Sequence, residues 1–167
     1  MRKQTYSLLV DNNSGVLSRI AGLFSRRGYS IDSITAGVTA DTRYTRITVV
    51  ATGDEMILAQ IEKQVRKLED VKEIKLLAEG ASVLRELLMV KLRTNASQRA
   101  ELLSITDIFR AKVVDVDASS ITIELTGDQA KLEGFLKMLS AFEILELART
   151  GVTGLSRGGE EITFVYN

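Results

Sequence analysis

Apolar residues change their spacing along this chain in an order that occurs twice. In residues 1–79, a strand-like run is followed by helical spacing, two β-branched runs, a second helical stretch and an alternating run. Helical spacing puts apolar residues at every third or fourth position, whereas alternation is typical of a half-buried strand. The same order returns in residues 83–153. We therefore predict a duplicated βαββαβ unit.

The helix boundaries support this plan. Gly28 ends the first predicted helix, because glycine readily adopts the conformation that follows a helix C-terminus. Thr52 to Glu55 has the form of a capping box before the second helix, and residues 126–129 have the same form before the last one. The apolar side of the first helix is predicted to be Val16, Leu17, Ile20, Ala21, Leu23 and Phe24. Each unit should form a four-stranded antiparallel sheet with two helices on one face.

The predicted fold class is therefore α+β, with two ferredoxin-like βαββαβ domains in tandem. The expected ranges are 1–79 for the first domain, 80–82 for a Gly-Ala-Ser linker, 83–153 for the second domain and 154–167 for a tail. The glycine-rich tail has two interpretations, a frayed end or a segment that orders on a partner. The first unit is longer between its helices, most simply in its hairpin.

Composition excludes several classes of function. The 22 basic and 22 acidic residues give no net charge, so bulk electrostatics do not favour nucleic acid or an anionic membrane. The absence of cysteine and histidine removes disulfides, thiolate metal sites and the commonest general base. No apolar run approaches the ~20 residues that cross a bilayer, and the first apolar run is too short for a signal peptide. We expect a cytoplasmic protein without catalytic residues.

A polar tetrad lies where the first strand turns into the first helix. It consists of Asn12, Asn13, Ser14 and Gly15. The first N–H groups of a helix lack internal partners and carry the positive end of the helix dipole, so they bind anions. Asn12 offers an acceptor and a donor, and Gly15 allows a close approach to the backbone. An α-amino acid needs these groups, but a routine N-cap and turn would use the same residue types.

Residues 7–37, SLLVDNNSGVLSRIAGLFSRRGYSIDSITAG, resemble the start of an ACT domain, a ferredoxin-like module that binds amino acids. Further along, IEKQVRKLEDV, RELLMVKL and RTGVTGLSRG extend the resemblance over roughly the whole chain. Taken together, these blocks resemble the small regulatory subunits of acetohydroxyacid synthase, also called acetolactate synthase.

The resemblance implies a chain with no active site and no cofactor of its own. It implies a catalytic large subunit as partner, which would carry thiamine diphosphate, Mg²⁺ and FAD. The small subunit would activate that partner and confer feedback inhibition by valine in branched-chain amino acid biosynthesis. It also implies a homodimer formed through the ACT domain. Whether valine, leucine or isoleucine is the effector stays open at this point.

Effectors of this family lie between two ACT domains. The resemblance places them against the first loop of one chain, with Asn12, Ser14, Gly15, Val16 and Leu17, and against the second strand of the other, with Ser30 and Ile31. Ser14 stands where many ACT loops have proline, and Ser30 where close relatives often have asparagine. The second unit has no glycine at its first turn, residues 94–101, which argues against a second amino-acid site there.

A free-standing amino-acid sensor, for example an ACT-type transcriptional regulator, is the alternative. The sequence shows no helix-turn-helix and no basic stripe, which favours the regulatory subunit. Arg26 and Arg27 are interpreted as a solvated helix end rather than as a phosphate-binding pair.

Overall fold

The structure, a computed structural model, describes residues 1–159. The chain forms two compact units. The first contains residues Met1–Val83 and the described residues from Val152 onward, and the second contains Leu84–Gly151. The chain therefore crosses from one unit to the other twice, at Val83 and again at Gly151.

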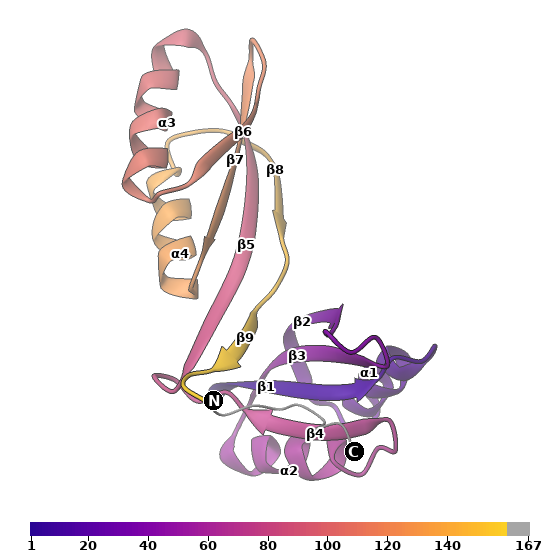
Figure 1. Cartoon of the computed structure of the whole chain (residues 1–167). Helices are drawn as coiled ribbons and strands as arrows, with labels where there is room; N and C mark the ends of the chain where they lie inside the picture. Colours follow the sequence, from indigo (N-terminus) through magenta and orange to yellow (C-terminus); the bar gives the residue numbers. More distant parts are fainter. Residues whose placement is uncertain (160–167) are drawn as a thin grey trace. The chain divides into compact units, whose positions relative to one another are not determined.

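The first unit is a four-stranded antiparallel sheet in the order β2-β3-β1-β4. Its elements are β1 (Arg2–Asp11), α1 (Val16–Arg26), β2 (Ser30–Val38), β3 (Tyr44–Gly53), α2 (Glu55–Val65) and β4 (Val71–Leu76). Tyr6, Leu8 and Val10 alternate along β1 and share one core with the buried sides of both helices. Because these residues point to a single face, both helices cover that face, as Figure 1 shows.

The other face of this sheet carries buried polar side chains. Thr35 of β2 pairs with Thr48 of β3, which in turn pairs with Ser7 of β1. Thr48 and Ser7 are fully buried although they point away from the helices. This face of the first unit is therefore covered at its centre.

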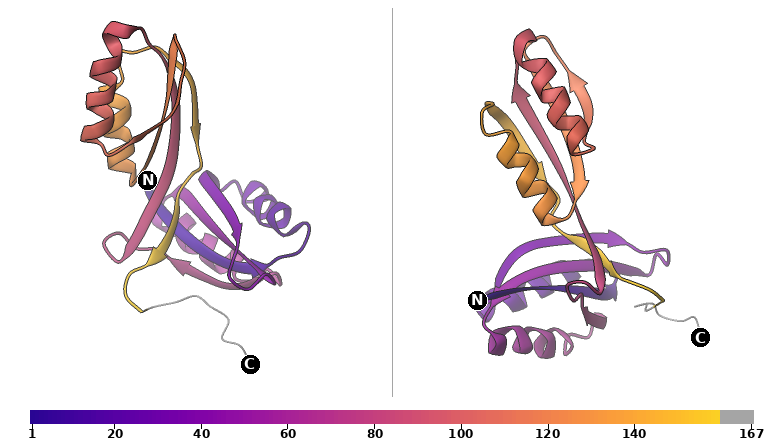
Figure 2. Two further views of the ribbon diagram at one scale, coloured as in Figure 1. Left: turned by 45° about the horizontal axis from the view of Figure 1, so that its top comes forward. Right: turned by 90° about the vertical axis from the view of Figure 1, so that its left-hand side faces the viewer.

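The second unit repeats the plan with the strand order β6-β7-β5-β8. Its elements are β5 (Ser82–Arg93), α3 (Ala96–Ile108), β6 (Lys112–Val116), β7 (Ser120–Gly127), α4 (Gln129–Met138) and β8 (Ile144–Arg149). The short strand β9 (Thr153–Ser156) pairs with β5 but groups with the first unit. Its core joins Leu88, Val90 and Leu92 of β5 to Leu102 of α3 and Phe135 of α4. Figure 2 shows both helices on one face of this sheet.

The duplicated βαββαβ plan is thus confirmed, including the longer hairpin of the first unit. The β2–β3 loop covers residues 39–43, whereas the β6–β7 loop covers residues 117–119. β2 and β3 are also longer than β6 and β7, so the strands contribute to the difference.

Both capping boxes predicted from the sequence were wrong in their N-cap. The side chain of Asp54, not that of Thr52, accepts the N–H of Ile57, and Asp128 caps Lys131 in the same way. The threonines still belong to the strands, and Thr52 donates its hydroxyl to Asp32. An aspartate directly before the helix reaches its N3 amide, which a residue two positions earlier does not.

The C-terminal part of the chain differs from its prediction as a tail. Residues 153–156 form β9, and residues from Val152 onward group with the first unit rather than following the second as a separate segment. The predicted linker is also shorter in the structure, because Ser82 already belongs to β5. Residues 160–167 of the predicted tail lie outside the described residues.

Candidate functional site

The N-terminus of α1 differs from those of the other helices in the described chain. Its N-cap is Gly15, with φ 85° and ψ −9°, and no side chain caps it. The helices α2, α3 and α4 are capped by Asp54, Asn95 and Asp128. The first turn of α1 also has no acidic residue. The positive end of the helix dipole therefore points out of a turn that no side chain caps, where a carboxylate can bind.

A cation lies beside this turn. An added Cβ on Gly15 would lie 2.9 Å from Nη1 of Arg19, so this guanidinium covers one side of the glycine. Arg19 makes a bidentate ion pair with Asp70, with Nε–Oδ2 2.6 Å and Nη2–Oδ1 3.1 Å. The hydrogen bond from Arg19 holds the pKa of Asp70 below its usual value, and the same bond raises the pKa of Arg19. The guanidinium therefore stays charged and fixed beside the candidate anion site.

Sequence reasoning did not single out Arg19 as a candidate site residue. Its position four residues after Gly15 was the available signal, because residues i and i+4 are neighbours on a helix. The glycine leaves room for the long side chain to fold back over the turn.

The side chain of Asn12 does not cap the helix, so the interpretation of the tetrad as a routine N-cap fails for this residue. Its side-chain amide donates to the carbonyl of Thr42 at 2.8 Å, and its Oδ1 accepts the hydroxyl of Thr45 at 3.1 Å. Its backbone N–H donates to the carbonyl of Arg43 at 2.8 Å. Asn12 thus fixes the turn to the β2–β3 hairpin, and its Oδ1 retains a second lone pair for an ammonium group.

The remaining loop residues differ in what they can offer a ligand. Ser14 is exposed, and Leu17 is 47% exposed instead of lying in the core as predicted. Val16 is only 3% exposed and belongs to the core, and its backbone N–H donates to the carbonyl of Asn13 at 3.5 Å. Leu17 lies one position past the first helical residue, where an exposed apolar side chain can contact that of a bound amino acid.

The two predicted sets of site residues lie at opposite ends of the sheet within one chain. Ser30 pairs with Thr52 near the beginning of β1, whereas Asp11, directly before the tetrad, pairs with Tyr44 at the other end of β3. Tyr44 and Thr52 are eight positions apart along β3. At roughly 3.3 Å per residue this distance is about 25 Å. A single chain therefore does not bring Ser30 and Ile31 to the turn of α1.

The corresponding turn of the second unit is closed. Asn95 accepts the N–H of Gln98 at 3.0 Å, and the side chain of Gln98 accepts the N–H of Asn95 at 3.3 Å. These reciprocal bonds occupy the groups that a carboxylate would need.

Within residues 1–159, no three or more acidic, histidine or cysteine side chains are placed together to hold a metal ion. In the same range, no helix is both long enough and apolar enough to cross a membrane.

The strand order of the first unit, with both helices on one face, defines a ferredoxin-like domain, and its glycine turn before an uncapped α1 is of the ACT type. A family model described as an AHAS small subunit-like ACT domain matches residues 6–73. A second, the small subunit of acetolactate synthase, matches residues 85–158. The chain belongs to the family of acetolactate synthase small subunits.

Individual relatives agree with this assignment. The chain is 47% identical to a probable acetolactate synthase small subunit of Methanothermobacter thermautotrophicus, over 91% of each chain. It is 45% identical to the small subunit of acetolactate synthase isozyme 3 of Escherichia coli, over 93% of this chain and 96% of that one. The crystal structure of the acetolactate synthase small subunit from Thermotoga maritima matches with a TM-score of 0.88 at 34% identity, covering 96% of this chain and all of that one.

Proposed function

We propose that this chain is a regulatory subunit that binds valine between two ACT domains and transmits that binding to a catalytic large subunit. In this proposal the large subunit holds thiamine diphosphate, Mg²⁺ and FAD and forms acetolactate. The small subunit raises the activity of its partner when unliganded and lowers it when valine is bound. Family membership supports the partner, and the geometry of α1 supports the ligand.

The observation that carries the proposal is the separation of the two sets of site residues. β2 is an edge strand of the sheet, and its exposed residues include Ser30 and Val38. If two copies pair antiparallel along β2 across a two-fold axis, the start of one β2 lies beside the end of the other. The end of β2 lies at the same end of the sheet as the α1 turn, because Val38 pairs with Thr45. A second copy thus supplies Ser30 and Ile31 where the first chain lacks them.

An α-amino acid fits the groups at this turn. Its carboxylate would accept the N–H groups of the first turn of α1, with the guanidinium of Arg19 at its side. Its ammonium group would donate to Oδ1 of Asn12. The aliphatic side chain of the ligand would contact Leu17 of the first copy and Ile31 of the second copy. Leucine and isoleucine present the same carboxylate and ammonium groups as valine. The space available for the aliphatic side chain therefore decides which of the three amino acids binds best.

The test is reconstitution with the large subunit. Acetolactate formation is measured with and without this chain, and then with valine, leucine and isoleucine added in turn. We expect activation by the chain, inhibition by valine and no activity of the small subunit alone. A large subunit that neither binds this chain nor changes its rate would contradict the proposal and favour the free-standing sensor.

A further inference from the structure

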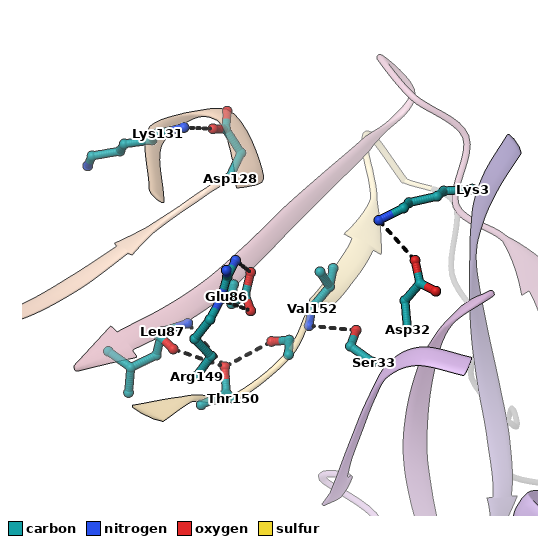
Figure 3. Close-up of polar contacts among 11 residues, drawn as sticks. Lys3, Asp32, Ser33, Glu86, Leu87, Asp128, Lys131, Arg149, Thr150 and Val152 are labelled. Atoms are coloured by element: carbon teal, nitrogen blue, oxygen red, sulfur yellow. Dashed lines mark hydrogen bonds and ion pairs between the residues drawn. The ribbon is translucent and has the colours of Figure 1, made fainter. Parts of the chain in front are cut away.

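Charged side chains fix a β-bulge at the start of β2, beside the predicted effector residues. The register of β2 with β3 shifts between Ile31 and Ser33, so Asp32 is an extra residue in β2. Its Oδ2 forms an ion pair with Nζ of Lys3 at 2.9 Å, as Figure 3 shows, and accepts the hydroxyl of Thr52 at 2.9 Å. The hydrogen bond from Lys3 lowers the pKa of Asp32, so its carboxylate remains charged at neutral pH. We call Lys3, Asp32 and Thr52 the β2 clasp.

The β2 clasp joins three strands of one sheet. Lys3 of β1 and Thr52 of β3 are paired across these strands, so their side chains point to the same face. Asp32 of β2 contacts both of them. The side chain of Asp32 is 27% exposed and that of Lys3 is 58% exposed, so water screens their attraction. The β2 clasp therefore orients the start of β2 more than it stabilises the fold.

The extra residue decides to which face of the sheet Ile31 points. Ile31 pairs with Ala51 and Ile34 pairs with Val49, and both isoleucines pack against the core of the first unit. In a regular strand, residues three positions apart point to opposite faces. If β2 ran back from Ile34 without a bulge, Ile31 would pair with Thr52 and turn its side chain to the face without helices. The bulge therefore keeps Ile31 on the helix side of the sheet.

A bulge in an edge strand of this fold does not require a charged residue. In the second unit the extra residues are Val114 in β6 and Leu145 in β8, and both are apolar and exposed. In the first unit the extra residue of β4 is Lys72, which forms an ion pair with Asp11 of β1 at 2.8 Å. The first unit thus fixes both of its edge strands to β1 through a charged bulge residue. The charge of Asp32 therefore serves the orientation of β2 and not the formation of the bulge.

The helix side of the sheet is also the side of the α1 turn. In the antiparallel pairing of two copies proposed above, the two-fold axis is perpendicular to the sheet, so the helices of both copies lie on one face. Ile31 of the second copy then points to the face on which α1 begins, and the exposed Ser30 precedes it. Without the bulge, Ile31 would point away from that turn.

We propose that Lys3 and Asp32 are positioning residues of the effector site, which hold the start of β2 in the orientation that presents Ser30 and Ile31 to the second copy. This role rests on the proposed function, because it requires that valine binds against these residues. The β2 clasp itself consists of residues of the first unit alone.

Charge exchange between the two positions tests this role. The variants Asp32→Ala and Lys3→Asp break the ion pair, whereas Lys3→Asp/Asp32→Lys restores one of reversed polarity whose ammonium group can still donate to the hydroxyl of Thr52. In titration calorimetry of the full chain, we expect each single variant to bind valine about fivefold more weakly and the double variant to bind within about twofold of the wild type. Lys91→Ala, which breaks the exposed ion pair with Glu146 in the second unit, is the control and should bind valine normally.

Urea unfolding separates this role from a loss of stability. Each variant should be folded under the conditions of the titration, so a loss of affinity that the double variant restores reflects the orientation of β2. If Asp32→Ala does not fold, Asp32→Asn, which keeps an oxygen for Thr52, replaces it. Unchanged affinity in the single variants, or a double variant that binds as weakly as they do, overturns the role of the β2 clasp alone. A wild type that does not bind valine overturns the proposed function and this role with it.

Discussion

At the scale of single residues, Gly15 combines two requirements. Its φ of 85° favours glycine, and a Cβ at this position would come within 2.9 Å of Arg19. Gly28 has a similar φ of 65°, but an added Cβ there would meet nothing within 4 Å. The pair therefore separates the effect of backbone strain from the effect of blocking the turn.

We predict that Gly15→Asp weakens valine binding at least tenfold, about 1.4 kcal/mol. The new carboxylate would occupy the site of the ligand's carboxylate and repel it. Activation of the large subunit should persist, since it needs the folded surface and not an occupied site. Gly28→Asp, the matched control, should lose some stability but bind valine normally. Titration calorimetry and the reconstituted assay measure both effects, and normal binding by Gly15→Asp would show that the site is misplaced.

Tyr6 supplies a prediction on pH. Its hydroxyl donates to the carbonyl of Leu58 at 2.9 Å, and burial, with a smaller contribution from Glu62, raises its pKa to about 12. The raised pKa means that the folded state keeps the proton longer than the unfolded chain does. The stabilisation is therefore complete below about pH 10 and is lost as the pH rises toward 12.

The variant Tyr6→Phe should lower the free energy of unfolding by about 1–2 kcal/mol at pH 7, because the buried hydrogen bond from the phenol to the carbonyl of Leu58 is lost. The free energy of unfolding, measured with urea, should also fall less between pH 7 and pH 10.5 in Tyr6→Phe than it does in the wild type. Tyr29→Phe is the control for removing a phenol from the same unit. An unchanged pH dependence in Tyr6→Phe would contradict the assignment.

At the scale of elements, the helix starts show what local pattern can and cannot determine. The order of strands and helices followed from apolar spacing, because each element must bury one face. The N-cap residues could not be assigned from local pattern, because Thr-Gly-Asp-Glu contains two good capping residues, Thr52 and Asp54, two positions apart. Only the length of β3, which extends through Gly53, decides that Asp54 is the cap. That length depends on pairing with β1, which is not local information.

The candidate site shows the same division. Residues 12–17 located the turn but were compatible with both a side-chain N-cap and an open helix end. The position of Arg19 over that turn depends on Asp70, which is 51 residues further along. β9 was missed because the four residues Thr153–Ser156 are too short for a period to be read. Its place is fixed by pairing with β5, and that partner lies in a distant part of the sequence.

The N-cap assignment makes a direct prediction for α2. Asp54→Ala should cost about 1 kcal/mol of stability, because the N–H of Ile57 loses its acceptor. Asp54→Ser should retain most of the stability, since serine also caps. Thr52→Ala should cost less than Asp54→Ala, as its hydroxyl bonds to the exposed Asp32 and not to the helix. Chemical denaturation of the three variants tests this order, and a larger loss for Thr52→Ala would restore the threonine as the cap.

At the scale of the whole molecule, the proposed effector site requires two chains. The sheet of the first unit has two edges, β2 and β4, and only β2 carries the second set of site residues. Pairing along β2 would both remove an open edge and complete the proposed site. Pairing along β4 would remove an edge but leave Ser30 and Ile31 apart from any α1 turn. Dimerisation and effector binding should therefore be lost together.

A charge on each edge separates these possibilities. Val38 at the end of β2 is 58% exposed, and Leu76 at the end of β4 is 38% exposed. Val38→Lys would place a lysine in each copy within the proposed strand pair, where burial of the charge is costly. We predict that the wild type and Leu76→Lys sediment as dimers at about 10 μM and bind valine, whereas Val38→Lys shifts toward monomer and binds at least tenfold more weakly. A monomeric wild type would remove the physical basis of the shared site. A dimeric Val38→Lys that no longer binds valine would place the interface elsewhere and leave β2 with a role in the ligand contact alone.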